Sequence, residues 1–407
     1  MLQSAGIGAL ALLTGMVMTR KLAWLQRFCI PSPVSGGILF SVATLVLYAV
    51  CDIEVNFDGT LKDVFMLAFF TSVGFQSNIK VIRQGGRMLA MMLVLLVVII
   101  ASQNLLPLFI TNAIGVDPLV GMAAGSISMA GGHGTAGGFS AVLEGMGLKG
   151  AGTIAMASAT FGLIAGSVIG GPVAEQLIRR KLTHEHMQPK DYALDPAMAG
   201  IESDEALPAG RALHQSSNEE ELHHYASATY TIVVVMAIGT LTSKALQYTG
   251  VTFPTYFGAL ITAAVVRNVA ECIGWGDRLE MDKIVSVGNI SLSLFLGMAM
   301  VSLKLWELQA LAMPLLTILL SQAALIALLS YFLAFRLLGR DYDAAVLVAG
   351  ICGFGLGATP NAMANMSAVC YKYHYSVRPF LIVPIVGAMF VDLLNTGIIT
   401  VFLNWIR

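Results

Sequence analysis

Two glycine-rich segments contain the residues of this chain that could do chemistry. The first reads GGHGT at residues 131–135, and the second reads GFGLGATPN at residues 353–361. Neither can remain regular helix without a free-energy cost, so each should expose backbone N–H and C=O groups. A helix that begins near Thr135 or Thr359 would present N–H donors and a positive dipole end to an anion. The two segments therefore predict an anion-binding site made largely of backbone.

The same segments could also coordinate a cation. Carbonyl groups released from a helix, such as that of Gly355, and hydroxyl groups such as those of Ser126 and Ser128 are oxygen ligands suited to Na⁺. A competing interpretation is that the glycines only allow close helix packing, as small residues often do in membranes. Paired breaks at matched positions in the chain favour the binding interpretation.

The match between the two segments extends into a repeat. Asp117 precedes the first glycine segment and Asp341 precedes the second, about 224 residues later. A similar offset relates Pro31 to Pro254. Two related halves, each with a glycine break inside apolar sequence, are typical of membrane transporters built from a repeat.

Other polar residues stand out against apolar surroundings. Asp392 lies within an apolar stretch, and a carboxylate at the centre of a spanning helix costs about 2.5–3.5 kcal/mol on insertion scales. It could hold a substrate ammonium group, contribute to a cation site, or make a structural hydrogen bond between helices. His133 could hold a substrate carboxylate or only tie its segment down. Asn361 and Asn365 are four residues apart, on one face of a helix.

These observations give two sets of candidate residues. Asn289, Ser291 and Ser293 are included as cation ligands, although short polar residues near a helix end are common. The substrate-binding candidates are Gly132, His133, Gly134, Thr135, Thr359, Pro360, Asn361, Asn365, Asp392 and Asn395. The Na⁺ candidates are Ser126, Ser128, Thr160, Asn289, Ser291, Ser293 and Gly355.

The composition indicates where such residues must be held. Hydrophobic residues make up 57% of the 407-residue chain and charged residues only 12%, against about 25% charged in soluble domains. The net charge of −1 gives no sign of a nucleic-acid partner. The five cysteines form no Cys-x-x-Cys pair, which argues against a disulfide framework or a structural zinc site. A polytopic, all-α membrane protein is the expected class.

Apolar stretches long enough to cross a bilayer predict about ten spans, five in each half. A first repeat at 1–178 and a second at 225–407 would flank a charged, histidine-rich linker at 179–224. The leftover segments 117–145 and 344–370 are each predicted to form a re-entrant hairpin. The expected spans are 3–19, 34–50, 61–78, 88–110, 151–178, 226–249, 253–271, 284–303, 309–336 and 378–404.

The positions of the basic residues predict how this arrangement is oriented in the membrane. An odd number of spans per half inverts the second repeat relative to the first. With the N-terminus outside, 18 of the 23 Lys and Arg residues fall in cytoplasmic segments, as the positive-inside rule requires. The N-terminus and C-terminus are therefore expected to be periplasmic and the linker cytoplasmic.

The chain also resembles a known family along nearly its whole length. It is similar to the bacterial sodium/glutamate symporters, and the resemblance is carried by several motifs. These are the Pro31/Pro33/Gly36/Gly37 pattern, MLAFF at 66–70, GSI at 125–127 with GGHGT, ATFGL at 159–163 with GGPVA at 170–174, GN-x-SLSLFL at 288–296, LKLWEL at 303–308 and the second glycine break.

The resemblance implies an inner-membrane protein that imports L-glutamate with Na⁺, using two inverted five-span halves with re-entrant loops. It implies no cofactor beyond the co-transported ion. We expect at least two Na⁺ per glutamate, because one extra charge lets the membrane potential assist uptake. A unit carrying both hairpins is expected to move against a more static unit, which could form a homodimer interface in the lipid bilayer. The alternatives are a Na⁺ symporter for citrate or a dicarboxylate, an intramembrane hydrolase and a passive channel.

Overall fold

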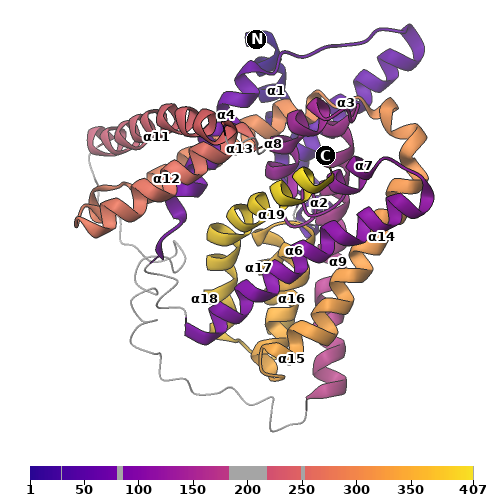
Figure 1. Cartoon of the computed structure of the whole chain (residues 1–407), viewed down its shortest axis with the longest axis vertical. Coiled ribbons are helices and arrows are strands. Elements are labelled where there is room, and N and C mark those ends of the chain that lie inside the picture. The colour runs from indigo at the N-terminus through magenta and orange to yellow at the C-terminus, as the bar shows by residue number, and fades with distance from the viewer. Residues whose placement is uncertain (29, 80–85, 183–217, 249–252, 407) are drawn as a thin grey trace.

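The computed structural model describes residues 1–28, 30–79, 86–182, 218–248 and 253–406. Within those ranges the regular structure is entirely helical, in agreement with the all-α prediction (Figure 1). The predicted linker lies mostly outside the described residues. The elements of the first half are α1 (Leu2–Lys21), α2 (Ala23–Arg27), α3 (Ser32–Cys51), α4 (Thr60–Gln76), α6 (Gly86–Ile114), α7 (Pro118–Ala123), α8 (Gly132–Gly145) and α9 (Ala151–Lys181).

The second half of the chain also consists of long and short helices. Its elements are α11 (Asn218–Gln247), α12 (Thr255–Cys272), η2 (Gly276–Arg278), α13 (Met281–Val301), η3 (Leu305–Leu311), α14 (Ala312–Leu328), η4 (Leu329–Ala334), α15 (Phe335–Leu337), α16 (Tyr342–Leu356), α17 (Thr359–Lys372), α18 (Val377–Ile385), η5 (Val386–Phe390) and α19 (Val391–Ile406).

Eight helices or continuous helical runs among the described residues are long and apolar enough to cross a membrane. They are α1, α3, α6, α9, α11, α13, the run α14–α15 and the run α18–α19. Helices α4 and α12 also occupy predicted span positions. However, α4 has only 17 residues, and α12 contains the ion pair between Arg267 and Glu271. The count of ten crossings therefore stays a prediction.

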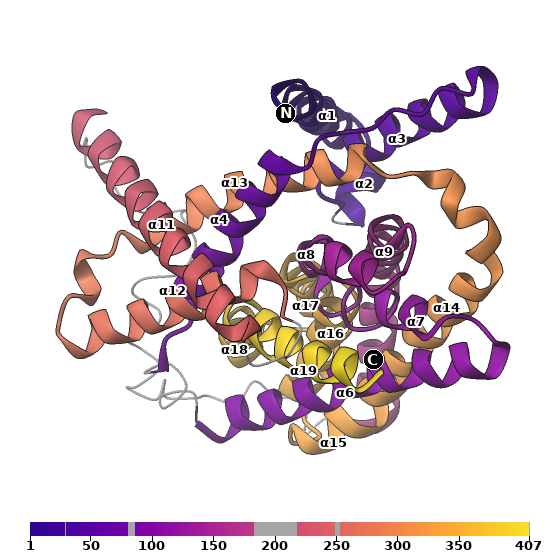
Figure 2. The same ribbon diagram turned by 45° about the horizontal axis from the view of Figure 1, so that its top comes forward.

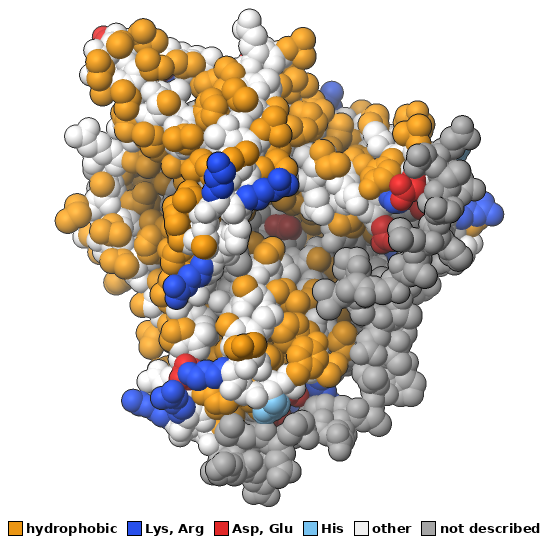
Figure 3. All heavy atoms as spheres, turned by 180° about the vertical axis from the view of Figure 1, so that it is seen from behind, with side chains coloured by type: hydrophobic (Ala, Val, Ile, Leu, Met, Phe, Trp, Pro, Cys, Tyr) orange, Lys and Arg blue, Asp and Glu red, His pale blue; other side chains and the backbone are white. Residues whose placement is uncertain are grey.

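Apolar side chains cover much of the described surface, as expected of helices that face lipid. Phe109, Met313, Val401 and Trp405 are each exposed over most of their side chain. The face shown in Figure 3 is largely hydrophobic, with many charged side chains gathered at its lower end. An acidic side chain also lies deep in a hollow near the middle of that face.

The helices divide into two groups by their packing. Helices α1, α3, α4, α11, α12 and α13 pack mainly on one another, and we call them the framework. Helices α6 to α9 and α14 to α19 pack mainly among themselves and form the inner group. In Figure 2, α8, α9, α16 and α17 lie at the centre, with framework helices along two sides. Each half of the chain contributes helices to both groups.

The two glycine segments interrupt helices, but over shorter stretches than predicted. Residues 124–131 form irregular turns between α7 and α8, and only Gly357 and Ala358 separate α16 from α17. Gly353 and Gly355 stay helical, contrary to the prediction. A Cβ at Gly353 would collide with the backbone of Ala362, so this glycine serves the close packing of α16 against α17. Helix α17 does begin at Thr359, whereas α8 begins three residues before Thr135.

Candidate functional site

The two glycine breaks meet inside the inner group. A Cβ built on Gly132 would lie 2.8 Å from the carbonyl oxygen of Gly357. Gly132 also has a φ of +57°, in the left-handed region that side chains disfavour. Both the conformation and the contact therefore require glycine here. Because α8 and α17 each start at this junction, two helix N-termini lie close together at one place in the bundle.

Helix α19 braces the first break with two polar side chains. The Thr135 hydroxyl donates to Asp392 Oδ1 at 3.2 Å, and Asn395 Nδ2 donates to the carbonyl oxygen of Ser126 at 3.0 Å. Asn395 is fully buried, and no described residue donates to its Oδ1. Four predicted site residues that are far apart in sequence thus lie together.

A local helix distortion precedes Asp392. Pro384 lacks an N–H group, and the widened turn η5 follows it directly. Within η5, a Cβ at Gly387 would collide with the Thr359 hydroxyl. The start of α17 therefore lies against the helical run that carries Asp392, so both breaks contact the same element.

His133 is tied to α9. Its Nε2 lies 3.0 Å from Thr160 Oγ1, and that hydroxyl donates its only hydrogen to the carbonyl oxygen of Met156 at 2.9 Å. The histidine must therefore be the donor to Thr160, which assigns the Nε2–H tautomer from the hydrogen-bond network. This arrangement favours the interpretation of His133 as a tether of the first break.

The second break is fixed to α9 by two amide side chains. Asn361 Nδ2 donates to the carbonyl oxygen of Leu163, and Asn365 Nδ2 to that of Gly166, each at 2.9 Å. Asn361 Oδ1 is buried and accepts no hydrogen bond within the part of the chain that the structure describes. Pro360 is exposed in the first turn of α17, where its missing N–H group has no helical partner to lose. Helix α9 therefore contacts polar residues of both breaks.

The predicted cation ligands fall into two separate places. The Ser126 and Ser128 hydroxyl groups are fully buried in the first break, and Ser128 donates to the carbonyl oxygen of Ala155 at 2.8 Å. Asn289, Ser291 and Ser293 lie on α13 in the framework instead. The two serines donate to carbonyl groups of their own helix. The described contacts bring the first pair to the junction of the breaks and do not bring the α13 set there.

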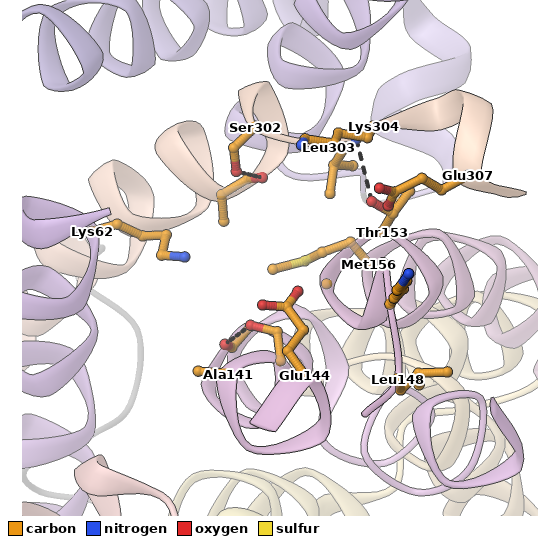
Figure 4. Close-up of a pocket in the computed structure, with 16 residues that line it drawn as sticks. Lys62, Ala141, Glu144, Leu148, Thr153, Met156, Ser302, Leu303, Lys304 and Glu307 are labelled. Atoms are coloured by element: carbon orange, nitrogen blue, oxygen red, sulfur yellow. Dashed lines mark hydrogen bonds between the residues drawn. The ribbon is translucent and has the colours of Figure 1, made fainter. Parts of the chain in front are cut away.

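A cavity of about 480 Å³ lies where the framework faces the inner group. Residues of α4, α13 and η3 line one side, and residues of α8 and α9 line the other. In Figure 4 the side chains of Lys62 and Glu144 project into the cavity from opposite sides. Neither has an ion-pair partner among the described residues. The charged residues that line the cavity are Lys62, Glu144, Lys149, Lys304 and Glu307.

Two charged groups at the rim of the cavity have shifted pKa values. Lys304 Nζ lies 2.5 Å from Glu54 Oε1, and this hydrogen bond raises the pKa of Lys304. Burial raises the pKa of Glu307, and the positive charge of Lys304 partly opposes that shift. Lys304 therefore stays charged near neutral pH, so the rim keeps a fixed cation.

Aromatic side chains of the framework close the cavity toward the glycine breaks. A Cβ on Gly137 would collide with the Phe295 ring, and one on Gly138 would collide with the Tyr256 ring. Tyr256 stacks on Phe70, with ring centroids 3.8 Å apart. Along α8 these contacts lie between Glu144 in the cavity and Thr135 at the first break. The cavity and the site of the breaks are thus separated by one aromatic layer.

Comparison with known proteins identifies the family of the chain. A family model described as sodium/glutamate symporter matches residues 1–375. The chain is 40% identical to the sodium/glutamate symporter of Escherichia coli (strain K12) over 396 residues, which cover 97% of this chain and 95% of that protein. The sodium/glutamate symporter of Haemophilus influenzae is 35% identical over 401 residues, covering 98% and 96%. No solved structure matches.

The chain belongs to the sodium/glutamate symporter family. Together with the eight apolar helices, this membership makes it a multi-pass membrane protein. The family is one of transporters.

The structure of this sodium/glutamate symporter family member also identifies polar residues that the sequence reasoning missed. Gln103 and Asn104 lie in the middle of α6, and Gln322 lies in the middle of α14; all three are fully buried. Asn104 bonds to Ser126 in the first break, and Gln103 Nε2 donates to the carbonyl oxygen of Gly355, near the second break, at 2.6 Å. Neutral amides inside long apolar spans were the available signal, because such groups need partners.

Proposed function

We propose that this protein imports L-glutamate together with Na⁺, as a secondary transporter. The observation that carries the proposal is the meeting of the two glycine breaks beside Asp392, in a chain of the sodium/glutamate symporter family. Buried backbone donors at two helix starts suit carboxylate groups, and a nearby carboxylate suits an ammonium group. L-Glutamate carries both carboxylate groups and an ammonium group. A citrate or dicarboxylate ion would gain nothing from Asp392.

In the proposed substrate site the first turns of α8 and α17 bind the carboxylate groups, and Asp392 binds the ammonium group. The unpartnered oxygen atoms of Asn361 and Asn395 add acceptors for the same ammonium group. Thr135 already bonds to Asp392, which holds the carboxylate in place before substrate arrives. The remaining substrate candidates are Gly132, His133, Gly134, Thr359, Pro360 and Asn365.

We propose ten crossings in two inverted halves, with α7–α8 and α16–α17 as the re-entrant hairpins. Contacts at the helix ends support this topology. Met1 lies 3.9 Å from Asp58, on the connection between α3 and α4, which places the N-terminus beside that connection. Lys372 at the end of α17 lies 2.6 Å from Glu175, six residues before the end of α9, where the linker follows. The N-terminus, the cavity and the C-terminus would then be periplasmic and the linker cytoplasmic, in a bacterial inner membrane.

For alternating access we propose that the inner group moves against the framework. The cavity between them, with Lys62 on one group and Glu144 on the other, would be the periplasmic entry. The aromatic layer at Phe295 and Tyr256 would close the route to the breaks in this conformation. The framework would also supply the interface of a homodimer.

The test is uptake of labelled L-glutamate into proteoliposomes under a Na⁺ gradient, with K⁺ in place of Na⁺ as the control. We expect uptake that requires Na⁺ and is competed by glutamate analogues but not by citrate or succinate. Uptake of citrate or succinate in place of glutamate would overturn the substrate. Uptake indifferent to the Na⁺ gradient would overturn the coupling and indicate a channel.

A further inference from the structure

The middle of α6 contains a polar junction that reaches both breaks. Pro107 has no N–H group, so the carbonyl oxygen of Gln103, four residues earlier, loses its helical partner. Gln322 Nε2 on α14 donates to that oxygen at 2.7 Å. Gln103 and Asn104 in turn bond to Gly355 and Ser126. One turn of α6 thus links α14, the first break and the end of α16.

Oxygen atoms converge at this junction. A Cβ on Gly125 would lie 2.9 Å from the carbonyl oxygen of Gln103 and 3.0 Å from both Asn104 Oδ1 and the carbonyl oxygen of Gly121. These three oxygen atoms, from α6 and α7, therefore lie around one point beside Gly125; the Gln103 carbonyl oxygen also accepts from Gln322, and Asn104 Oδ1 accepts from Ser126.

Two further oxygen atoms have no hydrogen-bond partner among the described residues. They are Gln103 Oε1 and Gln322 Oε1, on fully buried side chains whose amide nitrogens each donate a hydrogen bond. Native proteins rarely leave a buried acceptor unpaired, so these two oxygen atoms are suited to accept from a bound donor or to coordinate a cation. The set contains only neutral oxygen atoms, which suits a hard monovalent cation better than a divalent ion, whose protein sites usually include carboxylates.

We propose that Gln103, Asn104 and Gln322 form a Na⁺ site between α6, α14 and the first break. This inference rests on the proposed Na⁺-coupled transport and adds ligands outside the two breaks. Gln103 and Asn104 also hold Gly355 and Ser126, so an ion bound here would fix both breaks. Occupancy by Na⁺ would then raise the affinity for glutamate, and glutamate would raise the affinity for Na⁺ by the same factor.

The test compares two substitutions of Gln322 in the full-length protein. Gln322→Met removes both the unpaired oxygen and the N–H donor to Gln103 at similar volume, whereas Gln322→Glu keeps oxygen ligands, loses the amide donor and adds a carboxyl group that can carry a negative charge. Thr111→Val on α6 is the control, because Thr111 is equally buried but bonds only within its own helix. The readouts are thermal unfolding of purified protein in NaCl against KCl without glutamate, and the Na⁺ concentration that gives half-maximal uptake.

We expect NaCl to stabilise wild type, Thr111→Val and Gln322→Glu, but not Gln322→Met. The half-maximal Na⁺ concentration should rise by about tenfold or more in Gln322→Met, equivalent to about 1.4 kcal/mol. Two outcomes would overturn the proposal. If NaCl stabilises both Gln322 variants, the oxygen atom is no Na⁺ ligand and binds water instead. If NaCl stabilises neither variant, the N–H group and not the oxygen atom matters. The pair Gln103→Met and Gln103→Glu repeats the comparison if a Gln322 variant does not fold.

The two proposals fail in different ways. In the first case, Na⁺ stabilises the wild-type protein, Gln322→Met abolishes that effect, and no Na⁺-driven glutamate uptake is seen. This result would support the Na⁺ site and overturn the proposed transport function. In the second case, glutamate uptake is driven by Na⁺, but Gln322→Met and Gln103→Met respond to Na⁺ like the wild-type protein. This result would support the transport function and overturn the Na⁺ site.

Discussion

Asp392 is the residue on which the substrate assignment depends most directly. A carboxylate in a spanning helix costs about 2.5–3.5 kcal/mol, and its described hydrogen bond comes from a neutral donor, the Thr135 hydroxyl. A hydrogen bond to a charged group contributes about 1.5–3 kcal/mol, but this one supplies no counter-charge. The carboxylate therefore suits a cationic partner during the transport cycle, and in the proposed site the substrate ammonium group is that partner.

Replacing Asp392 should therefore weaken glutamate far more than Na⁺. For Asp392→Asn we expect the KM for glutamate to rise by about tenfold or more, equivalent to about 1.4 kcal/mol, with a much smaller change in the Na⁺ dependence of uptake. Thr400→Val is the control on the same helix, because its hydroxyl bonds only to the carbonyl oxygen of Thr396. A loss in Na⁺ affinity alone would instead assign Asp392 to a cation site.

Glu307 at the rim of the cavity predicts a pH effect of known sign. Its carboxyl pKa is raised above the usual 4.5, mainly by burial, so the folded protein binds this proton more tightly than the unfolded chain. The contribution of this carboxyl group to folding stability is then greatest below pH 4.5 and declines as the pH rises through its pKa in the folded protein. Glu307→Gln removes the decline. Its Tm relative to wild type should thus be higher at pH 8 than at pH 4, and an equal difference at both pH values would contradict the burial argument.

At the scale of elements, α8 presents a face of small residues to the framework. Gly134, Gly137, Gly138 and Ala141 recur at helical spacing, and the first three lie against Phe69, Phe295 and Tyr256. Small residues let a helix approach its neighbours closely. A face of small residues suits the proposed movement, in which α8 changes its position against the aromatic side chains of the framework.

A single added methyl group should interfere with that contact. In Gly138→Ala the new Cβ would collide with the Tyr256 ring, and overpacking of this kind typically costs about 1–3 kcal/mol. We expect a lower Tm and a lower rate of uptake. Gly145→Ala on the same helix is the matched control, because no atom lies within 4 Å of its added Cβ. If both variants transport like wild type, the close packing of α8 has no role in transport.

Elements were easier to predict than contacts between them. Helices or helical runs occupy all ten predicted span ranges, because long apolar stretches and Gly or Pro interruptions are local signals. The extent of the second break was overestimated, since Gly353 and Gly355 serve packing that depends on α17 and α14. Gln103 and Gln322 were missed for the same reason. Their partners lie more than 200 residues away in sequence, and no local pattern indicates such a pairing.

At the scale of the whole molecule, the charge carried per cycle decides how uptake is driven. Glutamate has one net negative charge, and its entry into a negative-inside cell costs about 2.3 kcal/mol per 100 mV. One Na⁺ cancels this cost, whereas two or more make the potential assist. With at least two ions per glutamate, uptake into proteoliposomes should accelerate when a K⁺ diffusion potential makes the interior negative. A rate independent of that potential would indicate a ratio of one.

The cavity between framework and inner group predicts a change of accessibility during the cycle. Lys62 lies on the framework helix α4 and Glu144 on the inner helix α8, and both project into the same space (Figure 4). In a background without the native cysteines, we expect Lys62→Cys and Glu144→Cys to react with a membrane-impermeant thiol reagent from the periplasmic side. Na⁺ and glutamate together should slow both reactions, because movement of the inner group narrows the space.

Two exposed lysines outside the cavity serve as controls for that measurement. Lys244→Cys should react from the periplasmic side at a rate that substrate does not change, and Lys372→Cys should react only from the cytoplasmic side. Reaction of Lys62→Cys from the cytoplasmic side would reverse the proposed orientation. Unchanged rates at both cavity positions, with Na⁺-driven uptake intact, would instead mean that access alternates by movement elsewhere. A group that slides past the framework must alter this cavity, because residues of both line it.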